Sequence, residues 1–262
     1  MSVPCIAGKT DPGCVRERNE DAIALDAELG LIVVADGMGG HNSGEVASGL
    51  AVDTIRDHAR EAVAGSGDPK LSPRRRKILA LIEKANAAIF EKSRALAKDQ
   101  GMGTTVVVAL VAGRSVAVGH VGDSRLYLLR QGQLKLMTED HSLVMDQVRH
   151  GLLTLEQAEK SPLQNILTRA LGTEERVLPD IQEFDLQPGD VLMICSDGLT
   201  KMVGEAEMRR VLTERQEAGD AVDELISLAR AAGGIDNVTV AVARVPNGGG
   251  FMARLIRSLF GG

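Results

Sequence analysis

Residues 31–40 read LIVVADGMGG, a short run of apolar, mostly β-branched residues that stops at an Asp-Gly pair. Short apolar runs of this kind are typical of buried strands, and Asp-Gly marks the turn that ends them. The pattern returns at residues 191–198, VLMICSDG, while residues 236–242, DNVTVAV, place the aspartate before the apolar run. We therefore expect the aspartates of these three stretches to lie at strand ends, where they could meet at one rim of a sheet.

These aspartates, Asp36, Asp197 and Asp236, would repel one another if they share a rim. A hard divalent cation held by oxygen ligands neutralises such repulsion. Taken alone, each aspartate is better explained as an ordinary turn residue or helix cap. Their joint occurrence next to buried strands favours a metal site.

The composition limits the classes of partner. The chain of 262 residues carries 30 basic and 36 acidic residues, a net charge of −6. This balance argues against nucleic-acid binding by bulk electrostatics, and no basic stretch carries interleaved aromatic residues. No apolar stretch approaches the roughly 20 residues that span a bilayer. The three cysteines form no CxxC pair and no signal peptide precedes them, so we expect reduced thiols and a cytoplasmic location.

Hydrophobic periodicity predicts strands, two long helices, four strands, a helical insert, two strands, two helices and a final strand. Short turns at residues 112–114 and 130–132 indicate hairpins and antiparallel pairing. The order lacks the regular alternation of a doubly wound fold. We therefore expect an α+β fold in which two antiparallel sheets pack as a central sandwich, with helices on both sides. The expected long helices are residues 43–64 and 73–98, the later ones 205–214 and 220–232, and the expected strands 3–9, 22–26, 31–36, 104–112, 115–121, 125–130, 133–137, 181–185, 190–195 and the run after Asp236.

Five clusters of polar residues and glycines are spread along this order. In the first, an arginine suited to bidentate phosphate binding stands beside acids suited to the water shell of a metal. The clusters are residues 11–21 (DPGCVRERNED), 36–41 (DGMGGH), 101–105 (GMGTT), 121–125 (VGDSR), and the pair formed by 196–198 (SDG) and 236–237 (DN).

In order and spacing, these clusters resemble the metal-dependent serine/threonine protein phosphatases of the protein phosphatase 2C type, in their compact bacterial form. Each motif is weak alone, but the set in this order is specific. The resemblance covers about residues 3–245 and implies a catalytic domain over residues 1–245. Two further stretches, residues 138–142 (TEDHS) and 165–172 (NILTRALG), resemble those that bracket the family's mobile flap.

The flap segment is therefore expected over about residues 142–170, as a small helical insert. The surface around it would determine substrate specificity, which residue types do not reveal. His141 and Ser142 stand where the segment begins, and we expect them to cap a short helix rather than to act in catalysis.

The resemblance also implies metal ligands. Asp36 would bridge two Mn²⁺ or Mg²⁺ ions, and the Gly37 carbonyl would be a backbone ligand. Asp197 and Asp236 would complete the first metal site.

The other ions would take ligands from two further clusters. Glu20 and Asp21 match the acids that hold the second metal or its waters. Asp123, together with Asp197, resembles the pair that holds a third metal in bacterial members of the family.

The chemistry implied by the resemblance needs no protein nucleophile. Two ions about 4 Å apart would activate a shared water, which attacks phosphorus in line with the serine or threonine oxygen. Arg16 would neutralise the phosphoryl oxygens. Animal-type relatives carry a histidine directly after Asp-Gly as the acid that protonates the leaving group, and here Met38 takes that place. His41 is a candidate acid and a metal-bound water is the alternative, so the sequence does not identify the acid.

The implied activity is hydrolysis of phosphoserine and phosphothreonine on proteins by a monomer, opposing a bacterial-type serine/threonine kinase. One alternative is a phosphoesterase for small phosphate esters. Another is a catalytically weak relative that serves as a regulatory binding module, and a third is a structural metal site. The retained Asp36, Asp197 and Asp236 argue against the weak relative, and Arg16 beside the acids argues against a structural site.

The last residues differ in character from the rest. Residues 246–262 begin with a Gly-rich linker, PNGGG, and continue in a short tail whose residues 251–260 would form an apolar stripe opposite arginines on a helix. Such a tail could dock a partner or an anionic membrane. Its ten residues are too few for firm anchoring alone, so folding back or disorder is the simpler expectation.

Overall fold

The computed structural model describes residues 4–39, 43–61, 70–95 and 101–246. The strands are β1 (Cys5–Asp11), β2 (Asp21–Asp26), β3 (Leu31–Met38), β4 (Gly103–Thr104), β5 (Val106–Ala112), β6 (Ser115–Val121), β7 (Arg125–Arg130), β8 (Gln133–Leu136), β9 (Asp180–Asp185), β10 (Val191–Cys195) and β11 (Val238–Arg244). They form two antiparallel sheets, in the orders β1-β11-β10-β7-β8 and β2-β3-β5-β6-β9, with β4 paired to β3.

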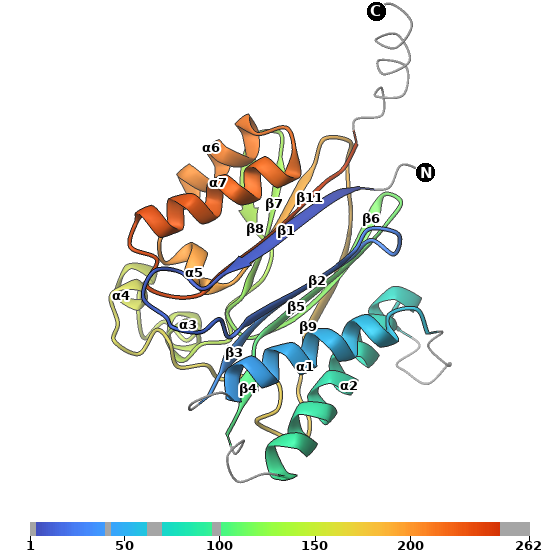
Figure 1. Ribbon diagram of the computed structural model, residues 1–262, viewed down its shortest axis with the longest axis vertical. Coiled ribbons are helices and arrows are strands. Elements are labelled where there is room, and N and C mark those ends of the chain that lie inside the picture. Colours follow the sequence, from blue (N-terminus) through green and yellow to red (C-terminus); the bar gives the residue numbers. More distant parts are fainter. Residues whose placement is uncertain (1–3, 40–42, 62–69, 96–100, 247–262) are drawn as a thin grey trace, which may run out of the picture.

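Helices cover both outer faces of this sandwich (Figure 1). The helices are α1 (Ser43–His58), α2 (Pro73–Ala95), α3 (Leu143–Arg149), α4 (Leu155–Glu159), α5 (Asp197–Thr200), α6 (Glu205–Glu214) and α7 (Ala218–Ala231). The first two pack on the sheet that contains β3, and α6 and α7 pack on the sheet that contains β11. The predicted α+β sandwich with helices on both sides is confirmed.

The apolar run of β3 is buried on both faces, which explains why it does not alternate with polar residues. Ile32 and Val34 belong to the core between the sheets. Leu31, Val33 and Ala35 belong to the core under α1 and α2. β10 alternates in the same way between the inter-sheet core and the core under α6 and α7. Aliphatic side chains supply nearly all of these contacts.

Most predicted element boundaries differ from the observed ones by a few residues. The predicted strand over residues 104–112 is two strands, because Thr105 donates its N–H to the Asp36 carbonyl and accepts from the Asp36 N–H through its hydroxyl. The first helix ends at His58, short of the predicted residue 64. Residues 62–69 lie outside the described residues.

The flap segment contains α3 and α4 and lies at the same end of the sandwich as α5 (Figure 1). Ser142 caps α3, since its hydroxyl accepts from the Met145 N–H. The expected capping role of His141 is wrong: its ring is buried and bonds elsewhere in the fold. None of the described helices is long and apolar enough to cross a membrane. The predicted tail over residues 246–262 lies, apart from its first residue, outside the described residues, so the domain division stays a prediction.

Candidate metal centre

Five aspartates from separate segments gather at one end of the sandwich. Antiparallel pairing of β2 with β3 places Asp21 directly opposite Asp36. The negative charges of the other four all raise the pKa of the Asp36 carboxyl; they belong to Asp21, Asp197, Asp123 and Asp236. Asp123 lies where the chain crosses from β6 in one sheet to β7 in the other, and Asp197 opens α5. The structure therefore brings together residues that are up to 215 positions apart, from 21 to 236.

Burial and mutual repulsion make this cluster costly when every member is charged. Burial raises the pKa of Asp21 to about 7, and nearby Asp197 and Asp236 act in the same direction. Burial, then Asp197 and Asp140, raise the pKa of Asp123 to about 7. The pKa of Asp36 is raised well above its usual range, by burial and then by Asp21. Such shifts mark a site that needs compensating positive charge.

The Asp21 carboxylate is held on one side only. Its Oδ2 accepts from the Ser196 hydroxyl at 2.8 Å and from the Thr239 hydroxyl at 2.7 Å. Its Oδ1, and Oδ1 of Asp197, are buried without a hydrogen-bond partner among the described residues. Buried carboxylate oxygens without donors are expensive unless a cation takes the donors' place. Hard oxygen donors of this kind suit Mn²⁺ or Mg²⁺, so the residues present fit the metal that the sequence predicts.

The backbone of Asp36 is fixed by the two threonines of the GMGTT cluster. The Asp36 carbonyl accepts from the Thr105 N–H at 2.8 Å and from the Thr104 hydroxyl at 2.9 Å. The Thr105 hydroxyl also lies 2.7 Å from that of Ser124, which follows Asp123. The threonines thus tie the two carboxylate-bearing segments together.

Gly37 lies where β3 passes the start of α1. A Cβ at this position would stand 2.1 Å from the Gly44 carbonyl oxygen and 2.6 Å from that of Glu20. Only glycine allows this approach. A Cβ on Gly44 would in turn meet the Glu20 carboxyl at 2.8 Å, so the Glu20 side chain packs against the helix start.

Asn237 organises the segment that carries Glu20 and Arg16. Its side-chain amide donates to the carbonyls of Pro12 at 3.0 Å and Arg18 at 2.8 Å, and its Oδ1 accepts from the Glu20 N–H at 2.8 Å. Three hydrogen bonds from one buried side chain fix residues 12–20 against the start of β11.

Two basic side chains reach the cluster from its rim. Arg16 makes a two-point ion pair with Asp236, Nε to Oδ1 at 3.0 Å and Nη2 to Oδ2 at 3.1 Å, and about half of its side chain is exposed. Lys201, one turn after Asp197, contacts that carboxylate through its ammonium at 2.5 Å. Both soften the negative field, and Arg16 does so with a guanidinium open to solvent.

The residue expected to protonate the leaving group cannot be located among the described residues. His41 lies outside the described residues. Met38 pairs with Gly103 of β4, and its thioether carries no proton to donate.

Several residues that build the site were not predicted. Ser196 and Asn237 stand in the fifth cluster but were given no role of their own, Thr239 was part of an apolar run, and Lys201 was in no predicted element. Hydroxyls and amides are common in such positions, so residue type alone gives no signal. The pairing of β10 with β11, which sets Ser196 beside Thr239, is the information that was missing.

Comparisons with known proteins agree with this geometry. A family described as protein phosphatase 2C matches residues 15–231. The chain is 40% identical to the serine/threonine phosphatase stp of Listeria monocytogenes over 235 residues, 88% of this chain and 92% of that protein.

Solved structures share the fold as well. The serine/threonine phosphatase PstP/Ppp of Mycobacterium tuberculosis superposes with a TM-score of 0.84 at 35% identity, covering 94% of this chain and all of that one. The catalytic domain of PstP in complex with two manganese ions gives a TM-score of 0.82 at 35% identity, with 94% and 99% covered. By sequence, fold and the residues gathered at its carboxylate cluster, this chain belongs to the protein phosphatase 2C family.

Proposed function

We propose that the chain is a metal-dependent protein phosphatase that hydrolyses phosphoserine and phosphothreonine. The observation that carries the proposal is the convergence of five aspartates with two buried, unpaired carboxylate oxygens among the described residues. Relatives named as serine/threonine phosphatases, at about two-fifths identity over most of the chain, support the substrate class.

The roles of the site residues follow from where each lies. We assign one cation to Asp36, Asp197 and Asp236, and a second to Asp36, the Gly37 carbonyl and the acids Glu20 and Asp21. We assign a third to Asp123 with Asp197. When bound, such Mn²⁺ or Mg²⁺ ions lower the pKa of a water and neutralise phosphoryl charge.

The chain's own groups position the substrate. Arg16 presents a planar guanidinium at the open side of the cluster, where its free N–H groups can donate to phosphoryl oxygens. Its ion pair with Asp236 sets the direction of the fork before substrate arrives. His41 stays the candidate for the proton donor to the leaving oxygen.

The test is phosphate release from a phosphothreonine peptide by purified protein, with Mn²⁺, with chelator, and for the Asp36→Ala variant in Mn²⁺. We expect turnover that needs the metal and is lost in the variant. Turnover of small phosphate esters without turnover of phosphopeptides would favour a phosphoesterase for small esters. Absence of turnover on either, by folded and metal-loaded protein, would favour a regulatory binding module.

We further propose that the protein acts as a monomer in the cytoplasm, on proteins phosphorylated by a serine/threonine kinase. The acidic balance of the chain and the absence of a membrane-crossing helix among the described residues are consistent with this setting. Gel filtration with light scattering tests whether the protein is a monomer.

A further inference from the structure

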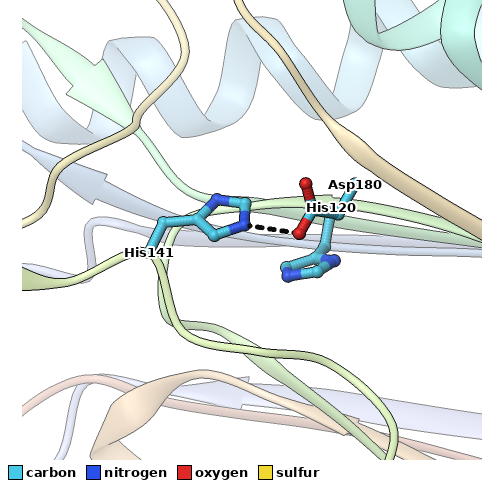
Figure 2. A group of neighbouring side chains, drawn as sticks. All are labelled: His120, His141 and Asp180. Carbon is cyan, nitrogen blue, oxygen red and sulfur yellow. Dashed lines mark hydrogen bonds and ion pairs between the residues drawn. The ribbon is translucent and has the colours of Figure 1, made fainter. Parts of the chain in front are cut away.

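Outside the aspartate cluster, two histidines and an aspartate form a second group of titratable side chains (Figure 2). His120 comes from β6, Asp180 opens β9, and His141 stands where the flap segment begins. The two imidazoles are buried and stacked, with ring centroids 4.6 Å apart and an angle of 27° between planes. The Asp180 side chain is half exposed.

The hydrogen bonds of His141 define its tautomer. The Gly122 N–H donates to its Nδ1 at 3.1 Å, so Nδ1 carries the lone pair. Burial lowers the pKa of His141 to about 4, which keeps the ring neutral near pH 7. The single ring proton therefore sits on Nε2, which donates to Oδ2 of Asp180 at 3.2 Å.

The same group could be read as a transition-metal site, since its ligand atoms lie within 4.8 Å of one another. The protons argue against that reading. Nε2 of His141 is a donor, and Nε2 of His120 lies 2.9 Å from the Glu139 carbonyl, which can only accept. Both Nε2 atoms therefore carry protons, and Nδ1 of His141 is taken by the Gly122 N–H, so His141 has no nitrogen left for a metal and the group falls short of three ligands.

His141 instead joins two parts of the chain. Toward the metal centre, it holds Gly122 twice: its ring accepts the Gly122 N–H, and its own N–H donates to the Gly122 carbonyl at 3.0 Å. Gly122 directly precedes Asp123. It has a positive φ of 102°, and a Cβ there would stand 2.6 Å from the Thr105 side chain. The ring and the backbone N–H of His141 therefore hold this turn, and the position of Gly122 leaves no room for a side chain.

Toward the flap segment, His141 is tied to its far end. The Thr168 N–H donates to the His141 carbonyl at 2.8 Å. The next residue, Arg169, donates to Oδ1 of Asp180 at 2.8 Å, while the other oxygen of Asp180 receives the His141 proton. A continuous set of hydrogen bonds thus links Arg169, through Asp180 and His141, to the turn before Asp123.

We propose that His141 is a positioning residue that holds the Gly122–Asp123 turn and couples the far end of the flap segment to cation binding at Asp123. The coupling rests on the proposed function, because that assigns a cation to Asp123. The positioning of the turn does not.

Two variants separate the two ends of the ring. His141→Asn can present an amide oxygen near the place of Nδ1 and so keep an acceptor for Gly122. His141→Gln reaches the place of Nε2 and leaves the Gly122 N–H without its acceptor. The matched control is His58→Asn. His58 is partly exposed on α1, and its Nδ1 bonds the Thr54 carbonyl of the same helix.

Manganese binding is measured by calorimetry, with Asp123→Asn identifying the binding step that depends on Asp123. We expect His141→Gln to weaken that step by about 10-fold or more, as loss of an outer-shell partner does in metal sites. His141→Asn keeps the acceptor for Gly122 but loses the proton donated to Asp180, so it should weaken that step less than His141→Gln does. His58→Asn should bind like wild type. Amide exchange of Gly122, followed by NMR, should be faster in His141→Gln alone. Equal binding and equal Gly122 exchange in the Asn and Gln variants would overturn the proposal.

Wild-type protein gives an independent test if the Gln variant does not fold. Nitrogen-15 spectra of the imidazoles should show Nδ1 of His141 unprotonated and Nε2 protonated, and a proton on Nδ1 would refute the positioning role. Failure of the proposed function would look different. Wild type would release no phosphate from peptides, while the tautomer and the Gly122 exchange would still follow the expectation.

Discussion

At the scale of single residues, Asp36 is a buried acid in electrostatic conflict with its surroundings. Its carboxyl is deeply enclosed and faces four other acids. A group in this position destabilises the folded, metal-free protein and becomes favourable only when positive charge is supplied. Stability and cation binding are therefore opposed at one side chain.

Asp36→Asn should separate these effects. Without metal, removal of the conflicting charge should raise the free energy of unfolding by about 1–3 kcal/mol. With Mn²⁺, phosphopeptide hydrolysis should fall by at least about 100-fold, because the shared ligand is lost. Urea denaturation in chelator and phosphate release in Mn²⁺ measure the two. Asp53→Asn, on the exposed face of α1, is the control and should change neither.

Asn237 supports a different residue-scale prediction, since it holds residues 12–20 through three hydrogen bonds. Asn237→Ala leaves the Glu20 N–H and two carbonyls without their partner and should lower the free energy of unfolding by about 2–4 kcal/mol. The loosened segment carries Arg16, so KM for a phosphopeptide should rise as well. An unchanged KM in a destabilised variant would show that the segment keeps its place without this amide.

The sequence predicts residues whose chemistry is rare and whose surroundings are distinctive, such as the aspartates after buried strands. It does not predict the hydroxyls of Ser196 and Thr239 on Asp21, because their part depends on strand register. The same holds for His141. Its sequence position suits a helix cap, and only the contact with Gly122 reveals another role.

At the scale of elements, β3 and α1 can approach closely because each has a glycine at the point of contact, Gly37 in β3 and Gly44 in α1. Gly37→Ala would force a Cβ into the Gly44 carbonyl, 2.1 Å away, and should lower the free energy of unfolding by about 1–3 kcal/mol and weaken manganese binding. Gly49→Ala is the matched change within α1, where a Cβ would meet nothing within 4 Å. It should raise the free energy of unfolding by about 0.5–1 kcal/mol. Thermal denaturation of the pair measures the difference, and equal melting temperatures would contradict it.

Element types and the hairpins β5–β6 and β7–β8 follow from local patterns, and both are observed as predicted. The assignment of each strand to one of the two sheets does not follow from local patterns. β9 and β10 are joined by a short turn at Pro188 and Gly189, yet β9 pairs with β6 and β10 with β7 and β11. Nothing in the turn sequence distinguishes a hairpin from a crossing between layers, because the choice is made by which core each apolar face fills.

At the scale of the whole molecule, protons and cations compete for the same carboxylates. The pKa values of Asp21 and Asp123 are about 7 in the folded, metal-free protein, against about 3.9 for an unfolded chain. Between these values the folded state holds protons that the unfolded state has released. The contribution of these groups to stability is therefore lost as pH rises through 7.

Mn²⁺ should consequently raise the melting temperature more at high pH than at low pH. We expect a shift of at least about 4 °C at about pH 8 and a much smaller one at about pH 5.5, where protons occupy the carboxylates. Calorimetric melting of chelated and metal-loaded protein at both pH values tests this. A larger shift at the lower pH would contradict the raised pKa values.

The central place of β11 has a consequence for how the protein is made. β11 lies between β1 and β10, and among the described strands it is the last in the chain, yet it is the direct partner of the first. On a ribosome, β1 must wait for residue 244 before it gains that partner, and Asp236 joins the other aspartates at the same moment. A nascent chain therefore has no assembled centre until β11 has been made, and a product that stops before Asp236 lacks one of the five clustered aspartates.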